Sequence, residues 1–146
     1  MRYALDVQYR GKFYAGSQIQ FENGKDITEP TIQGELERAL CTLINAGRCK
    51  GKNDESYDNT TTKSIKPGTD IGQINKQNRL VKTIFSGRTD KGVNALGQVV
   101  HFDTDKEIVA SSFIYHINEI LPSDISVNNL RIVPDSFHAQ KSAKSR

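Results

Sequence analysis

Hydrophobic and polar positions alternate at the beginning of the chain. Apolar or aromatic side chains stand at every second position from Tyr3 to Tyr9, and the opposite face would carry Arg2, Asp6 and Gln8. A period of two residues is typical of a β-strand with one face buried and the other in water. The pattern therefore predicts a strand over this segment.

Three later segments are short and apolar. They cover residues 80–85, 98–102 and 125–133 and are flanked by glycine or polar residues. Runs of this length, rich in β-branched and aromatic residues, favour strands. In the third segment the pair Asn128-Asn129 interrupts the apolar pattern, which predicts a bulge or a turn there.

From Thr31 the apolar period lengthens to that of a helix. The residues expected on its apolar face are Ile32, Leu36, Ala39, Leu40, Leu43 and Ile44, and those expected to face water are Glu35, Glu37 and Arg38. Thr31 has the side chain of an N-cap, and Gly47 stands where the helix is expected to end. Cys41 falls on the apolar side, which predicts a buried thiol rather than a reactive one.

A second stripe of helical period follows the third predicted strand. Its members are Ala110, Phe113, Ile114, Ile117 and Leu121. The polar residues 103–105 are expected to cap the start of this helix, and Pro122 is expected to end it. His116 lies within the helix without a second metal-ligating side chain at a suitable offset, so no metal site is predicted.

The order of these elements is strand, helix, strand, strand, helix, strand. That order predicts an α+β fold of the ferredoxin-like type, in which an antiparallel sheet is covered on one face by two helices. Residues 1–47 and 80–146 are expected to form one such domain. Residues 48–79 are polar, with too few apolar side chains to offset the entropy of ordering, and are interpreted as a disordered insertion.

Composition adds limits to this picture. A chain of 146 residues with 36% hydrophobic and 25% charged residues fits one soluble domain, and its net charge of +3 is compatible with a polyanionic partner. The two cysteines, Cys41 and Cys49, are too few for a disulfide framework. No apolar segment approaches the length that crosses a bilayer, so the expected location is the cytoplasm, with no membrane partner.

The candidate chemistry lies between the second and third predicted strands. There Arg88-Thr89-Asp90 follows Gly87, in a loop that also contains Gly92 and, at its end, Gly97. The glycines permit a tight loop that fixes the direction of the aspartate, and the neighbouring cation favours an ionised carboxylate, which suits a nucleophile. Spacing alone favours the alternative, a plain turn in which the aspartate caps local backbone.

The run GRTDKGVNALGQVVHF, residues 87–102, resembles the catalytic signature of the TruA-type tRNA pseudouridine synthases, which is close to GRTDAGVHAxGQVxHF. The resemblance implies that Asp90 is the essential aspartate, that Arg88 helps to displace and hold the target nucleotide, and that Thr89 lies in the substrate site. Two positions depart from the pattern, because Lys91 replaces alanine and Asn94 replaces histidine.

The last twelve residues resemble a second signature of that family, D-x-F-H-A-R-x-S-A-x-x-R, which contacts tRNA in its members. The substrate-binding residues that this resemblance implies are Phe137, His138, Ala139, Gln140, Lys141 and Arg146. Gln140 stands where the family has arginine, which removes one expected phosphate contact. The alternative interpretation is a frayed basic tail.

Residues 9–20 resemble a third family pattern, Y-x-G-x-x-F/Y-x-G-x-Q-x-Q, with Ser17 where tryptophan is frequent. Gln18 and Gln20 are candidate RNA contacts, together with Asn94 and His101 of the central signature. It is equally consistent with the sequence that the aromatic residues are core and the glutamines are solvated.

The resemblance implies an isomerase that converts uridine to pseudouridine in the anticodon stem-loop of tRNA, without a cofactor and as a homodimer. It covers only the amino-terminal portion of a family member. The carboxy-terminal domain is therefore expected to be absent and the chain alone to be inactive or nearly so. Two alternatives remain, a non-catalytic RNA-binding module and an unstable fragment with an exposed sheet edge.

Overall fold

The computed structural model describes residues 1–22, 25–26, 29–46 and 81–144. Its elements in chain order are β1 (Arg2–Tyr9), β2 (Phe21–Glu22), β3 (Lys25–Asp26), α1 (Ile32–Asn45), β4 (Thr83–Phe85), β5 (Ala95–Asp103), α2 (Ala110–Ile120) and β6 (Ile125–Val133). The predicted insertion, and the predictions for Gly47, Cys49 and Arg146, lie outside the described residues.

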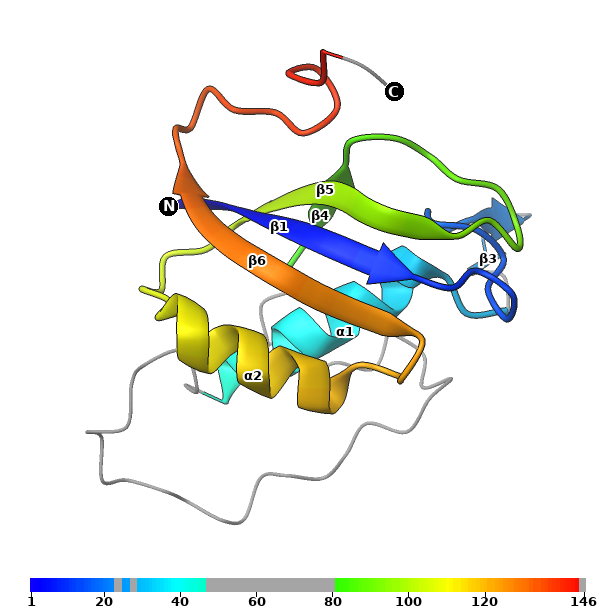
Figure 1. The fold of residues 1–146 in the computed structure, drawn as a ribbon, viewed down its shortest axis with the longest axis horizontal. Coiled ribbons are helices and arrows are strands. Elements are labelled where there is room, and N and C mark those ends of the chain that lie inside the picture. The colour runs from blue at the N-terminus through cyan, green and yellow to red at the C-terminus, as the bar shows by residue number, and fades with distance from the viewer. Residues whose placement is uncertain (23–24, 27–28, 47–80, 145–146) are drawn as a thin grey trace.

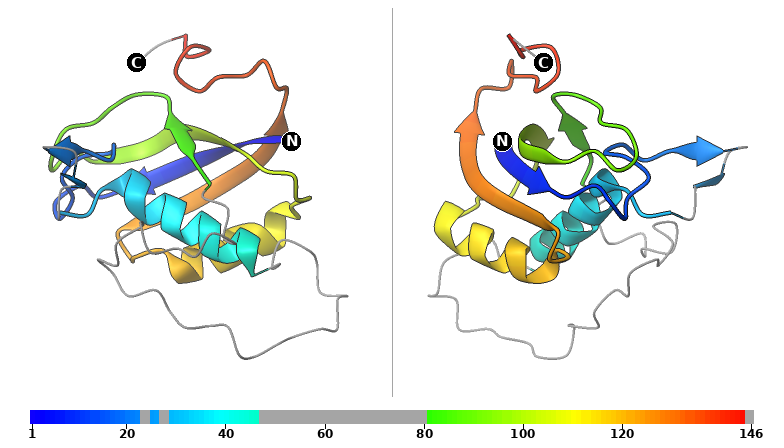
Figure 2. Two further views of the ribbon diagram at one scale, coloured as in Figure 1. Left: turned by 180° about the vertical axis from the view of Figure 1, so that it is seen from behind. Right: turned by 45° about the vertical axis from the view of Figure 1, so that its right-hand side comes forward.

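Four strands form one sheet in the order β4-β5-β1-β6, and every pair of neighbours is antiparallel. Both helices lie on the same face of this sheet (Figures 1 and 2). The α+β, ferredoxin-like arrangement predicted from the element order is confirmed. The short β2 and β3 pair separately, as a hairpin that the sequence pattern does not predict.

The alternation in β1 places its apolar side chains in the core beneath the helices. Tyr3, Leu5, Val7 and Tyr9 are each no more than 2% exposed. They pack in one cluster with the apolar stripes of α1 and α2, including Leu36, Leu40, Phe113 and Ile117. Cys41 belongs to the same cluster, as predicted. The two periodicities thus meet in a single hydrophobic core.

Helix α1 begins as predicted, because the Thr31 hydroxyl accepts a hydrogen bond of 3.1 Å from the Gly34 N–H. The prediction that its glutamates face water is wrong, since Glu35 is 7% and Glu37 is 4% exposed. Glu35 forms an ion pair with Arg38. Glu37 reaches β4, where one carboxylate oxygen accepts from the Thr83 N–H at 2.8 Å and the Thr83 hydroxyl at 2.9 Å.

Helix α2 starts later than its predicted cap. Its N-cap is Val109, whose side chain makes no capping hydrogen bond, so the prediction that residues 103–105 cap the helix is wrong. Asp103 instead ends β5, where it accepts hydrogen bonds from the Arg2 guanidinium. The helix ends before Pro122, as predicted.

The bulge predicted in β6 is confirmed. Asp6 pairs with Asn129 and the following Val7 pairs with Val127, so Asn128 is the extra residue between the two registers. A bulge of this kind raises the local twist of its strand, here β6 at one edge of the sheet.

Within the described residues, neither helix has the length and apolar composition that a membrane span requires.

Candidate active-site loop

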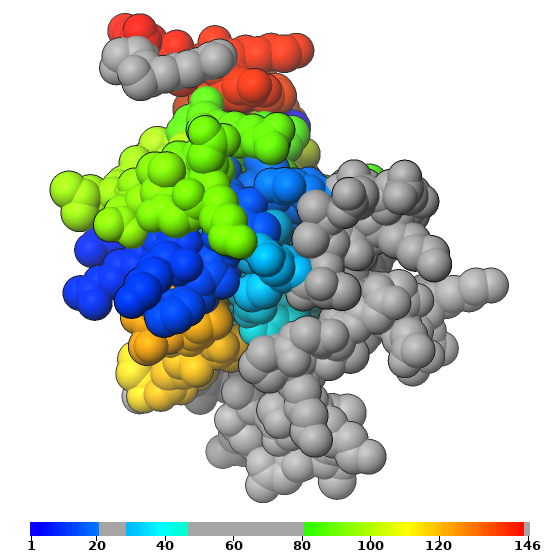
Figure 3. Space-filling model, turned by 90° about the vertical axis from the view of Figure 1, so that its right-hand side faces the viewer, coloured from blue at the N-terminus to red at the C-terminus, as the bar shows by residue number. Residues whose placement is uncertain are grey.

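Two loops lie side by side at the end of the sheet where β1 finishes and β5 starts. We call residues 10–20 the amino-terminal loop and residues 86–94 the aspartate loop. In Figure 1 the amino-terminal loop lies beyond the tip of the β1 arrow, and the aspartate loop arches above β5 from the end of β4 to the start of β5. In Figure 3 their blue and green atoms form one continuous surface. Backbone and side-chain hydrogen bonds join them at both Thr89 and Asn94.

The start of the aspartate loop is fixed by a buried glutamine of β5. The side-chain oxygen of Gln98, Oε1, accepts from the Gly87 N–H at 3.1 Å and from the Ser86 hydroxyl at 2.5 Å. The side-chain amide nitrogen of Gln98 donates to the Gly87 backbone carbonyl at 2.7 Å. Gln98 is 8% exposed. Because both backbone groups of Gly87 are bound, the chain leaves β4 in a defined direction before Arg88.

Thr89 is held on three sides. Its N–H donates to the Ser17 hydroxyl at 2.8 Å, its carbonyl accepts from the Ser17 N–H at 3.0 Å, and its hydroxyl lies 2.7 Å from the Tyr9 hydroxyl. Ser17 is fully buried. Gly16, with φ of +117°, lies so close that a Cβ would come within 3.0 Å of the Thr89 carbonyl oxygen. The residue before Asp90 is therefore rigidly placed.

The far end of the loop rests on the amino-terminal loop. The Val93 N–H closes a turn onto the Asp90 carbonyl at 3.2 Å, and Gly92 supplies the positive φ of +81° that this turn requires. The side-chain oxygen of Asn94, Oδ1, accepts from the Gly11 N–H at 2.9 Å. A Cβ on Gly11 would lie 2.1 Å from the Val93 carbonyl oxygen, so only glycine allows this contact.

Two charged side chains project from this fixed backbone into solvent. Arg88 and Asp90 are both exposed. In the described part of the chain no N–H or hydroxyl donates to the Asp90 carboxylate, so it does not act as a local cap. Lys91, by contrast, pairs with Glu29 at 3.0 Å. The loop thus presents a solvent-accessible carboxylate with a guanidinium two residues away, on a backbone whose direction is set in advance.

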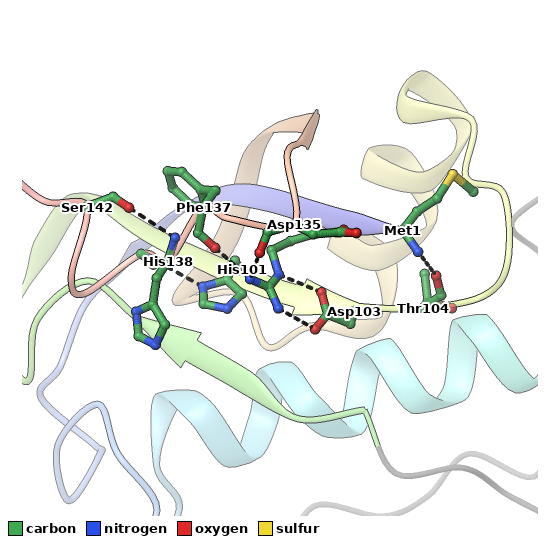
Figure 4. A network of polar contacts seen from close by, with 10 residues as sticks. Met1, His101, Asp103, Thr104, Asp135, Phe137, His138 and Ser142 are labelled. Carbon is green, nitrogen blue, oxygen red and sulfur yellow. Dashed lines mark hydrogen bonds and ion pairs between the residues drawn. The ribbon is translucent and has the colours of Figure 1, made fainter.

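Residues 135–144, which we call the tail, are folded against the opposite end of β5 (Figure 4). The Ala139 N–H donates to His101 Nδ1 at 3.0 Å. Arg2 donates to the carbonyls of Asp135 at 2.5 Å and Phe137 at 2.7 Å. These ten residues are therefore folded against the sheet and do not form a frayed tail.

His101, a candidate RNA contact, is covered by the tail. It is 2% exposed, and the rings of Phe137 and His138 lie edge-on to it at 6.0 Å and 5.0 Å between centroids. Burial lowers the pKa of His101, and the charges of Arg2 and His138 lower it further. A neutral ring suits the structure, because Nδ1 must be unprotonated to accept from Ala139.

The other candidates have mixed positions. Gln20 donates to the Ala15 carbonyl at 2.7 Å and so stabilises the amino-terminal loop, whereas Gln18 is half-buried. In the tail, Gln140 and Lys141 are exposed, and Ala139 is buried. Hydrogen bonds join the first and third family patterns directly. The tail, which carries the second pattern, lies above the aspartate loop in Figures 1 and 3.

Sequence reasoning misses three supports of the loop. Tyr9 is assigned to the core by its alternation, yet its hydroxyl reaches Thr89. Ser17 is noted only as a departure from tryptophan, and no local pattern marks it as a partner of a residue 72 positions away. Gln98 lies inside the GQV part of the central signature, so its position in that motif is the signal that could have singled it out.

Fold and loop together define a class: a ferredoxin-like domain that presents an exposed carboxylate beside an arginine, at the end of its sheet. The chain matches no model of a known protein family. Among curated proteins it is 38% identical over 146 residues to the protein named tRNA pseudouridine synthase A of Polynucleobacter asymbioticus. Proteins of the same name from Bacillus licheniformis and Colwellia psychrerythraea are 33% and 34% identical over 146 residues.

These matches confirm the resemblance carried by the motifs, since they cover the whole of this chain. They cover 41%, 44% and 41% of the three relatives. The chain therefore spans about two fifths of the length of the curated relatives that it matches.

Proposed function

We propose that this chain forms the part of a tRNA pseudouridine synthase that carries the reacting carboxylate, Asp90. The observation that supports this most strongly is the exposed carboxylate on a loop fixed at Gly87, Thr89 and Asn94. Residues 1–47 and 80–146 then form one catalytic half-domain, with 48–79 as an insertion. The proposed substrate is a uridine in the anticodon stem-loop of tRNA, modified in the cytoplasm.

The proposed reaction explains why the site needs a carboxylate. Conversion of uridine to pseudouridine breaks the bond from N1 of the base to C1′ of the sugar, turns the base and joins C5 to C1′. C5 then releases a proton and N1 takes one up, so the product is an isomer of the substrate. A carboxylate can attack an electrophilic carbon of the base or sugar and leave again, or stabilise positive charge at C1′. Neither route changes the oxidation state, so the reaction as proposed needs no cofactor.

The exposed arginine, Arg88, is proposed to help the target base leave its stack and reach Asp90. A base within a stem or stacked loop must leave its stack before a carboxylate can reach it. A planar guanidinium can stack in the vacated space and bind phosphate bidentately. Arg88 follows Gly87, whose backbone is held by Gln98, and is assigned this role.

Remaining parts of the proposal concern RNA binding and assembly. Exposed residues of the tail, with Phe137 and His138 beside them, form a second RNA contact, and Arg146 is included from the motif alone. We assign Gln18 a direct RNA contact as well, whereas Gln20 and Asn94 are tied to the loop backbone. The whole enzyme is proposed to be a homodimer.

The test uses a chimera in which this chain replaces the matching segment of the Bacillus licheniformis relative. We expect the chimera to release tritium from uridine labelled at C5 in an anticodon stem-loop substrate, because the chain supplies Asp90 to a complete cleft. The 146-residue chain alone is expected to release little, since groups from the rest of the relative are missing and water enters the site. A chimera that binds the RNA but releases no tritium would contradict the proposal.

A further inference from the structure

One aromatic side chain of the amino-terminal loop has no role in the fold. Phe13 is 71% exposed, whereas the adjacent Tyr14 is 5% exposed and donates a hydrogen bond of 2.6 Å to Asp124. The sequence does not decide whether these two aromatic rings belong to the core or contact RNA. The structure gives them different positions. Tyr14 anchors the loop, and Phe13 stands in water.

The surroundings of Phe13 are cationic. The Lys12 ammonium lies 5.4 Å from the centroid of the Phe13 ring. In the same loop Arg10 and Lys12 are both exposed, and among the described residues neither forms an ion pair. An exposed ring among unpaired cations is the combination that binds single-stranded nucleic acid, with stacking on the ring and attraction to phosphate.

Phe13 is also fixed relative to Asp90. Its loop is bound on one side through Gly11, which contacts Val93 and Asn94, and on the other through the Ser17 and Thr89 backbone pair. The tight turn from the Gly11 carbonyl to the Tyr14 N–H, at 3.0 Å, presents the ring at its corner. Figure 3 shows the two loops as one uninterrupted surface.

We propose that Phe13 is a stacking platform for an unpaired base of the RNA whose target nucleotide lies at Asp90. The inference rests on the proposed function and adds to it a contact with a neighbouring nucleotide. RNA is favoured over an apolar protein partner because the Lys12 ammonium lies over the ring, and Arg10 and Lys12 have no ion-pair partner among the described residues. Stacking there would hold the strand open next to the reacting carboxylate.

The chain contains no tryptophan, so a single indole can report on each position. In the full chain, Phe13→Trp places the probe on the loop, and Tyr115→Trp places a matched probe on α2, where the native ring is 62% exposed. We expect an anticodon stem-loop RNA to quench the fluorescence of the first variant and leave that of the second unchanged. Heparin, which has charge but no bases, is expected to quench neither.

Affinity gives an independent measure. Phe13→Ala is expected to weaken binding of the same RNA by about five- to a hundredfold, the range for loss of one stacked base, whereas Phe13→Tyr and Tyr115→Ala are expected to keep it. Absence of quenching at position 13, equal quenching at position 115 or by heparin, or an unchanged affinity of Phe13→Ala would each overturn the inference. Quenching at position 13 together with a chimera that binds RNA but releases no tritium would refute the proposed function alone.

Discussion

The central residue contact is between Ser17 and Thr89. The pair exchanges two hydrogen bonds, Thr89 N–H to the Ser17 hydroxyl and Ser17 N–H to the Thr89 carbonyl, at 2.8 Å and 3.0 Å. Ser17 is fully buried. A buried donor that loses its acceptor pays its full desolvation cost, so this contact both stabilises the protein and orients the residue before Asp90.

Replacement of Ser17 by alanine tests that contact. Ser17→Ala leaves the Thr89 N–H without its acceptor, and we expect the free energy of unfolding to fall by about 1–3 kcal/mol. Urea unfolding followed by circular dichroism measures it, with the exposed Ser123→Ala as control. A loss no larger than that of the control would show that Ser17 does not hold the loop.

At the scale of elements, Glu37 joins α1 to β4. Its carboxylate accepts from the Thr83 N–H and hydroxyl and from the Gln33 amide at 3.1 Å. Burial raises the pKa of Glu37, although these hydrogen bonds and the charge of Lys82 oppose the rise. The folded state therefore holds the proton of Glu37 more tightly than the unfolded state does.

The sign of the pH dependence follows from that difference. Between the unfolded pKa of about 4.3 and the raised folded pKa, the folded state binds more protons, so the contribution of Glu37 to stability falls as pH rises. Glu37→Gln keeps a carbonyl acceptor for Thr83 and does not ionise. We expect its free energy of unfolding to gain relative to the native chain as pH rises from 4 to 7.

Urea unfolding at several pH values between these limits measures the gain. The exposed Glu107→Gln is the matched control, and its difference from the native chain is expected to stay flat over the same range. If the curve for Glu37→Gln is equally flat, the carboxylate is not held in a desolvated site.

Strong periodicity explains what the sequence predicts well. The alternation in β1 and the apolar stripe of α1 identify which face of each element is buried. The bulge at Asn128 is predictable because it interrupts a short apolar pattern. The burial of Glu37 is not predictable in this way, because its partner Thr83 is 46 residues distant. The capping signal at 103–105 fails because Asp103 remains in β5, bound to Arg2.

The candidate site follows the same division. Motif resemblance finds Arg88 and Asp90, whose side chains are exposed, as the roles proposed for them require. It does not find Ser17 or the burial of His101, since both depend on how distant segments fold together. His101 is enclosed only because the tail returns across β5 to place Ala139 on it.

At the scale of the whole molecule, the amino terminus and the start of the tail meet at one end of the sheet. The terminal ammonium of Met1 donates to the Thr104 carbonyl at 2.8 Å, and Arg2 joins Asp103 of β5 to the tail (Figure 4). Figures 1 and 3 show the tail above the aspartate loop, so the two segments border the same side of the molecule. That arrangement suits two contacts with one RNA.

The most direct test of the account is Asp90→Asn in the chimera, with tritium release and RNA affinity measured on the same preparation and Glu107→Gln as control. Because the Asp90 side chain accepts no hydrogen bond in the described structure, the account predicts that folding and affinity persist while release falls by about a thousandfold or more. Release from Asp90→Asn at the rate of the control would contradict it.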